Sequence, residues 1–378
     1  MKGKTREILI SISLVVASII FLLLFLELIS IAINLETGTA AMYYENGQKA
    51  SNLKVYSPCS NASENTTVTL VGASGEFKVK VVYNTDHPVR LGGQGEADEL
   101  NNLEGSFVVA SIGDSCTFSY VDPNETFSAV FEAEANKMAG RKTKVLNFGI
   151  PALNPNDYLV VLRQSAVRYK PSVILVNIYP GNDILGKRED SSALIALSQK
   201  NQSLCSSAGP SLKASLLGIA SQSRFFRFIA QKVAVIYHRQ LMRDEYYAAY
   251  LLDDPERELR YNPVFNTLLE MKRIAAEMNA TLIVSILPDA MEIDQSAWDT
   301  YFAADKNKYS PDVPQRLIKE FGAREGIIIL DPFQEYRVDK TDLNSFYYPI
   351  DLHFNKAGNE EFGRELYSQA KEKGVFPN

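Results

Sequence analysis

The chain has 378 residues, 46% of them hydrophobic and 22% charged, with a formal net charge of −6. This composition is typical of a globular protein, and no internal repeat or low-complexity tract indicates a solenoid or a disordered scaffold. The acidic balance argues against a protein that seeks nucleic acid phosphates, so no nucleic acid partner is expected.

The first predicted element is a membrane-spanning helix. Lysine or arginine occupies positions 2, 4 and 6, and an uncharged apolar run of 19 residues follows over residues 8–26. Crossing a bilayer takes roughly 20 apolar residues, so we expect residues 1–33 to form a cytoplasmic tail and an anchor. The rest of the chain would then lie on the extracytoplasmic side. A cleaved signal peptide is the alternative, and it exports the same domain.

Residues 34–105 are polar and rich in turns. Short runs over residues 68–72, 76–84 and 88–93 have the composition of strands. We therefore expect a small β-rich arm between the anchor and the main domain.

From residue 106 onward, apolar strands alternate with helices. Near-continuous apolar strands are typical of a parallel sheet that is covered on both faces, and right-handed crossovers then give a doubly wound α/β fold. A mostly helical insert interrupts the alternation over about residues 184–278. Five strands are predicted, over residues 106–113, 144–149, 171–179, 281–287 and 326–330.

The helix predicted over residues 122–140 has clear start and stop signals. Asp122 is the expected N-cap, Pro123 takes the first helical position, and Glu125 closes a capping box. Gly140 is the expected end. Further helices are predicted over residues 154–169, 311–325 and 355–374, the last with Asn355 as its cap.

Small and polar residues follow the first three strands of this α/β unit. Ser115 follows the first strand, Gly149 the second, and the Gly181-Asn182-Asp183 stretch the third. His353 lies after the fifth strand, just before the last helix. Because sites in such sheets lie outside the carboxyl ends of the strands, we expect these residues to share one rim.

Ser115 needs a base to become a nucleophile, and histidine is the suitable base near neutral pH. The chain has three histidines, and among His87, His238 and His353 only the last is predicted at the rim. Asp351 is the expected carboxylate that orients this imidazole, with Asp342 as the reserve candidate.

A tetrahedral oxyanion needs hydrogen-bond donors. Three donors are predicted at the rim, namely the backbone N–H of Ser115, the backbone N–H of Gly149 and the side-chain amide of Asn182. Asp114 and Asp183 are conspicuous acids beside them. For both we favour turn hydrogen bonds to neighbouring N–H groups over a catalytic role.

Four stretches carry a family resemblance: GDS at 113–115, NFG at 147–149, GND at 181–183 and DLHFN at 351–355. In this order they resemble the four blocks of the SGNH/GDSL hydrolase superfamily, over residues 106–373. The resemblance implies a flavodoxin-like three-layer sandwich with a five-stranded parallel sheet, and a catalytic domain over residues 106–378.

The resemblance also implies serine ester chemistry without a metal or another cofactor. It assigns Ser115 as nucleophile and oxyanion donor, Gly149 and Asn182 as further oxyanion donors, and Asp351 with His353 as the acid–base pair. The short D-x-H spacing is similar to that of membrane-anchored SGNH proteins and alginate-acetyltransferase-like relatives.

The first functional hypothesis is a membrane-anchored extracytoplasmic serine esterase that removes O-acyl groups, most simply O-acetyl groups, from a carbohydrate. Its partner would be an acylated glycan or another ester substrate. Three alternatives stay open: a polysaccharide O-acetyltransferase with the same triad, a lipid esterase, and a non-catalytic glycan-binding protein on the same fold.

Overall fold

The computed structural model of the chain describes most of the predicted α/β unit. Several predicted features lie outside the described residues. They are Asp351, Asp342, most of the predicted anchor and most of the predicted helical insert. Within the described part, no helix combines the length and the apolar composition needed to span a bilayer. The described residues are 103–137, 142–151, 153–184, 247–302, 306–334, 336, 343–348 and 352–376, five N-terminal strands, and helical positions 18, 22, 25, 26 and 29.

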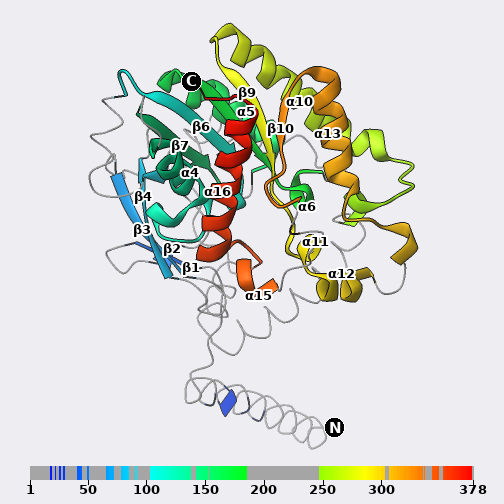
Figure 1. The fold of residues 1–378 in the computed structure, drawn as a ribbon. Coiled ribbons are helices and arrows are strands. Elements are labelled where there is room, and N and C mark those ends of the chain that lie inside the picture. The colour runs from blue at the N-terminus through cyan, green and yellow to red at the C-terminus, as the bar shows by residue number, and fades with distance from the viewer. Residues whose placement is uncertain are drawn as a thin grey trace, which may run out of the picture.

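The strands form one mixed sheet in the order β10-β9-β8-β6-β7-β5-β4-β3-β1-β2 (Figure 1). The first five strands in this order pair in parallel, which confirms the predicted five-stranded parallel sheet. They are β6 (Phe107–Gly113), β7 (Thr143–Gly149), β8 (Val173–Ile178), β9 (Thr281–Ile286) and β10 (Ile328–Leu330).

The other five strands are antiparallel and come from the β-rich region before residue 106. β5 joins β7 through the pair Arg90 and Asn147, so this region extends the edge of the main sheet. These strands are β1 (Ala41–Tyr44), β2 (Lys49–Ala50), β3 (Asn65–Val71), β4 (Lys78–Asn84) and β5 (Arg90–Leu91).

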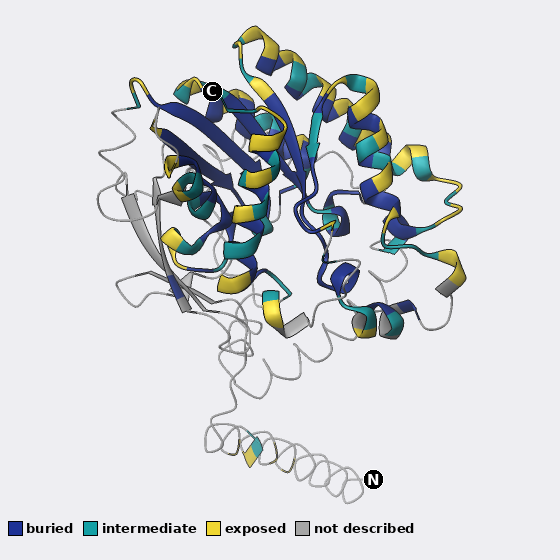
Figure 2. Cartoon of the chain, in the orientation of Figure 1, coloured by how far each residue is buried: buried dark blue, intermediate teal, exposed yellow. Residues whose placement is uncertain are grey.

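Both faces of the parallel sheet are buried (Figure 2). Along β6, the side chains of Val108, Ala110 and Ile112 belong to one hydrophobic cluster, and those of Phe107 and Val109 belong to another. Successive side chains of a strand point to opposite faces. Two covered faces therefore require the near-continuous apolar runs seen in the sequence.

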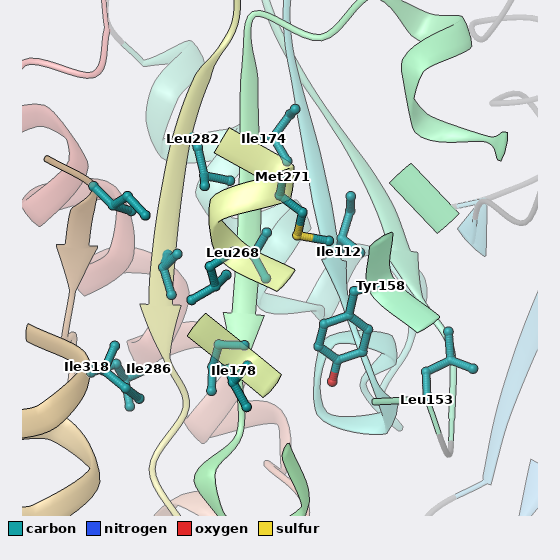
Figure 3. Packing of buried hydrophobic residues seen from close by; sticks show 14 of the residues in the cluster. Ile112, Leu153, Tyr158, Ile174, Ile178, Leu268, Met271, Leu282, Ile286 and Ile318 are labelled. Carbon is teal, nitrogen blue, oxygen red and sulfur yellow. The ribbon is translucent and has the colours of Figure 1, made fainter. Parts of the chain in front are cut away.

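Helices cover the two faces and make three layers. On one face, α5 (Pro155–Gln164), α10 (Arg257–Glu277) and α13 (Val313–Glu325) contribute Tyr158, Leu268, Met271 and Ile318 to the cluster shown in Figure 3. On the other face, α4 (Phe127–Asn136) and α16 (Lys356–Glu372) contribute phenylalanines and a leucine.

Short helices connect these layers. Two of them follow parallel strands directly, α3 (Ser115–Phe118) after β6 and α6 (Pro180–Asp183) after β8. The others among the described residues are α11 (Ala290–Ile293), α12 (Gln295–Phe302), α15 (Leu343–Phe346) and the 3-10 turns Pro123–Glu125, Ala166–Tyr169, Tyr247–Tyr250 and Lys306–Lys308.

The predicted start of the helix over residues 122–140 is wrong. Asp122 makes no capping hydrogen bond, and α4 begins after Thr126, whose hydroxyl accepts from the Ala129 N–H at 3.2 Å. The extended backbone of Thr126 separates the preceding 3-10 turn from α4, so Thr126 and not Asp122 is placed to cap the helix. Gly140, the predicted end, lies outside the described residues.

The predicted cap of the last helix is confirmed. The Asn355 carboxamide oxygen accepts from the Gly358 N–H at 3.0 Å. This cap fixes the point at which the chain turns from the rim of the sheet into α16.

Helix α16 crosses α4 closely at Gly363. A Cβ atom at this position would lie 2.7 Å from the Phe127 carbonyl oxygen and 2.7 Å from the Val130 Cβ. Both neighbours belong to the facing helix, so the absence of a side chain sets the distance between the two helices.

Gly363→Ala should lower the free energy of unfolding by about 1–2 kcal/mol, because the new methyl group overpacks this crossing. Alanine is otherwise the better helix former by about 1 kcal/mol, so the sign is informative. Urea unfolding measures this change in the free energy of unfolding. The control is Ser368→Ala, at an exposed position on the same helix. A stabilised Gly363→Ala would contradict the close crossing.

Candidate active site

The rim at the carboxyl ends of the parallel strands brings the predicted residues together. Gly113 and Gly149 are register partners at the ends of β6 and β7. The chain continues from β6 into Ser115 at the start of α3, and from β8 into Asn182 within α6. Parallel strands end on the same edge, so three separate segments supply side chains to one place.

Ser115 and His353 are in hydrogen-bonding contact. The distance from the Ser115 Oγ to the His353 Nε2 is 2.9 Å, across 238 positions of sequence. Ser115 is half-buried, and its backbone N–H has no acceptor among the described residues. A hydroxyl at this distance from an imidazole nitrogen is the arrangement in which the ring can take the hydroxyl proton.

Asp114 shapes the turn that presents Ser115. Its carboxylate accepts from the Cys116 N–H at 2.9 Å and so caps α3. The side chain is completely buried, and burial raises the pKa of Asp114; hydrogen bonds from Asn182 and Cys116 and the charge of His353 oppose this rise. The prediction that Asp114 accepts a turn hydrogen bond from a neighbouring N–H is confirmed.

Asn182 is oriented by the same carboxylate. Its Nδ2 donates to the second oxygen of Asp114 at 2.7 Å. A carboxamide nitrogen carries two hydrogens, so one of them is left for another acceptor. Asp114 therefore fixes both the turn of Ser115 and the direction of the amide that was predicted as an oxyanion donor.

Asp183 stabilises the short helix that carries Asn182. Its carboxylate accepts from the Tyr179 N–H at 2.9 Å and from the Tyr158 hydroxyl at 2.9 Å. Burial, followed by the charges of Asp114 and Asp183, raises the pKa of Tyr158, so this phenol stays protonated and donates. The favoured structural reading of Asp183 is confirmed as well.

Gly149 lies against α3, the short helix that begins at Ser115. A Cβ at this position would be 2.2 Å from the Phe118 backbone nitrogen, so only glycine allows the approach. Its N–H, predicted as an oxyanion donor, donates instead to the Asn147 Oδ1 at 2.8 Å, while the Asn147 Nδ2 donates to the Thr117 carbonyl at 2.8 Å. In this arrangement Gly149 contributes close packing, and its N–H already has an acceptor.

The His353 ring packs against an aromatic residue of the rim. The ring of Tyr120 meets it edge-on with 4.7 Å between centroids. Tyr348 supports both residues, because its hydroxyl donates to the Tyr120 carbonyl at 3.2 Å and its N–H donates to the His353 carbonyl at 2.9 Å. The carboxylate that orients the ring stays a prediction, since Asp351 and Asp342 lie outside the described residues.

A buried polar chain, which the sequence analysis missed, lies in the sheet just below Ser115. The Asn177 Nδ2 donates to the Ser111 Oγ at 3.0 Å, and the Ser285 Oγ donates to the Asn177 Oδ1 at 2.6 Å. All three side chains are fully buried. The signal was one polar residue near the end of each of three adjacent apolar strands, β6, β8 and β9.

No protein-family model matches the chain, and no curated protein matches it in sequence. Solved structures do match. A protein described as a lipolytic member of the G-D-S-L family from Desulfitobacterium hafniense is 12% identical with a TM-score of 0.38, over 70% of this chain and 99% of its own.

Two acetylxylan esterases give similar matches. The esterase AlAXEase is 10% identical with a TM-score of 0.40, over 69% of this chain and 98% of its own. A catalytic mutant of Axe2 from Geobacillus stearothermophilus is 13% identical with a TM-score of 0.38, over 70% and 94%.

The raised pKa of Asp114 gives a test of its burial. The folded protein keeps a proton on this group to a higher pH than the unfolded chain, so its contribution to stability is complete below about pH 4 and is lost as the pH rises through the raised pKa. Asp114→Asn has no such loss. The free energy of unfolding of the variant relative to wild type should therefore rise from pH 4 to pH 7.

Urea unfolding at four pH values between 4 and 7 measures this difference. The altered hydrogen bonds of the variant add a constant offset, and other titrating groups cancel in the comparison. Parallel stability curves for the two proteins would contradict a buried, proton-retaining Asp114.

Proposed function

We propose that this protein is an ester hydrolase of the SGNH type, with Ser115 as its nucleophile and His353 as its general base. The 2.9 Å contact between the Ser115 Oγ and the His353 Nε2 carries this proposal. A serine hydroxyl becomes nucleophilic when a neighbouring base accepts its proton, and this pair has the required distance.

In the first step the Ser115 Oγ attacks the acyl carbonyl carbon, and the hydroxyl proton passes to the His353 Nε2. The tetrahedral intermediate collapses, and the departing alcohol takes the proton from the imidazolium. Water then attacks the acyl-enzyme and gives its proton to the same nitrogen. The second tetrahedral intermediate collapses, the Ser115 Oγ leaves and takes that proton back from the imidazolium, and the acid is released. Asp351 is proposed to hold the imidazole and to stabilise its cation.

The oxyanion of both intermediates accepts from the Ser115 N–H and the Asn182 Nδ2. The Ser115 N–H begins α3 without an acceptor in the described part of the chain, and Asp114 already directs the amide of Asn182. Donors that are fixed before the reaction stabilise the developing charge without reorganisation.

For the substrate we propose O-acyl groups, most simply O-acetyl groups, of a carbohydrate outside the cytoplasm. The basic residues and the uncharged run over residues 8–26 support an anchored, exported enzyme. The D-x-H spacing of Asp351 and His353, similar to that of membrane-anchored relatives in polysaccharide pathways, supports a glycan.

Ser115→Ala and His353→Ala should each lower kcat for an aryl acetate by at least about 10³-fold, because either change removes the nucleophile–base pair. Ser368→Ala, on the exposed side of α16, serves as the matched control and should keep wild-type turnover. A Ser115→Ala protein as active as wild type would refute the enzyme and favour a binding protein.

Asn182→Ala should lower kcat by about 10²–10³-fold with a smaller change in KM, since the lost donor acts mainly in the transition state. Asn156→Ala, at the exposed start of α5, is the matched control. An Asn182→Ala variant that raises KM alone would show that this amide binds substrate in the ground state.

Acetate release from an acetylated glycan, measured with and without excess deacetylated oligosaccharide, identifies the acyl acceptor. Hydrolysis predicts the same acetate yield in both reactions. Acetyl transfer to the added oligosaccharide at the expense of acetate would identify an O-acetyltransferase with the same nucleophile. Release of fatty acid from lipid vesicles but no acetate from glycans would identify a lipid esterase.

A further inference from the structure

Asn359 is a polar residue on the buried side of α16. Its exposed fraction is 0%, and Phe362, Leu366 and Ala370 follow it on the same helical face with the same value. A carboxamide in this position loses its contacts with water, so it is tolerated only where protein groups replace them.

All four hydrogen-bonding positions of the Asn359 carboxamide are occupied. Its Oδ1 accepts from the Ser119 hydroxyl at 2.8 Å and from the Phe127 N–H at 3.0 Å. Its Nδ2 donates to the carbonyl oxygens of Phe354 at 3.1 Å and Asn355 at 3.0 Å. A backbone N–H can only donate and carbonyl oxygens can only accept, so these partners fix the orientation of the amide.

The partners of Asn359 flank the two residues of the proposed mechanism. Ser119 ends the short helix that Ser115 begins, and the Ser119 N–H donates to the Ser115 carbonyl at 3.0 Å. Phe354 directly follows His353. One side chain thus joins the nucleophile helix to the segment of the base.

The backbone is strained on both sides of this link. Ser119 has a φ of 61° and Leu352, which directly precedes His353, has a φ of 64°. Residues other than glycine rarely adopt such values, and they persist where surrounding contacts determine the conformation. For Ser119, the hydrogen bond from its hydroxyl to Asn359 is a contact of this kind.

We propose that Asn359 is a positioning residue that sets the distance between the Ser115 Oγ and the His353 Nε2. This inference rests on the proposed function of the same site. Asn359 does not touch the reacting atoms; it acts through Ser119 and Phe354. Its loss allows the nucleophile helix and the base segment to separate.

The test compares Asn359→Leu, which keeps the size and removes every side-chain hydrogen bond of residue 359, with Ser119→Ala. The second variant removes the bond from the Ser119 hydroxyl to Asn359, together with the contacts of this hydroxyl with the Cys116 and Thr117 carbonyl oxygens. We expect kcat for an aryl acetate to fall by roughly 10- to 100-fold in Asn359→Leu, because a misplacement of about 1 Å has that effect. KM should change little. The rate at which a fluorophosphonate modifies Ser115, followed by intact mass, should fall in parallel, with a smaller loss in Ser119→Ala.

Gln369→Leu is the matched control. Gln369 lies on the same helix and likewise ties α16 to another segment, by accepting from the Asp331 N–H at 2.8 Å and donating to the Asp331 carbonyl at 3.0 Å. The Gln369→Leu variant is expected to be less stable than wild type but to keep the wild-type rate of Ser115 modification. If Asn359→Leu does not fold, Ser119→Ala against this control decides the test.

The outcomes separate this inference from the function on which it rests. Modification of Ser115 at the same rate in wild type and in both test variants overturns the positioning role alone. A wild-type protein that no fluorophosphonate modifies at Ser115 refutes the proposed function, and the positioning role falls with it. An equal loss in the rate of Ser115 modification in Gln369→Leu would show that Asn359 only stabilises the fold, and it would overturn the inference.

Discussion

The site depends on one contact, that between the Ser115 hydroxyl and the His353 imidazole. The two atoms are 2.9 Å apart, although 238 positions separate their residues in the sequence. No local propensity can bring such distant residues together, so the sheet must do it. Ser115 lies at the rim because it follows the end of strand β6. His353 lies at the same rim because it precedes α16, which packs on the face of the sheet that α4 also covers.

Buried polar groups fix the arrangement of the side chains at this rim. Asp114 joins the turn of Ser115 to Asn182, and Asn177 links the three strands beneath them. The Asp114 and Asn177 side chains have hydrogen-bond partners that compensate for lost hydration, and such partners specify a single arrangement. The apolar layers hold the fold together, whereas this polar layer fixes where the reacting groups lie.

The parallel sheet and most of its helices could be predicted from the sequence, because two buried faces leave an apolar signal in every strand. The start of α4 could not, because the choice between Asp122 and Thr126 depends on where Phe127 packs. Ser115 could be predicted from the GDS stretch, and His353 could be predicted because it was the one histidine expected at the rim. The role of Asn359 could not be read from the sequence, since its partners are fixed only by tertiary contacts far along the chain.

The order of the segments along the chain has a consequence for synthesis. Ribosomes make Ser115 first, and 238 further positions must follow before the imidazole exists. During that interval the Ser115 hydroxyl lacks its His353 partner, and α16 is not yet present to complete the second layer. A nascent chain, or one truncated before residue 353, therefore lacks the proposed base, and the proposed ester chemistry requires nearly complete translation.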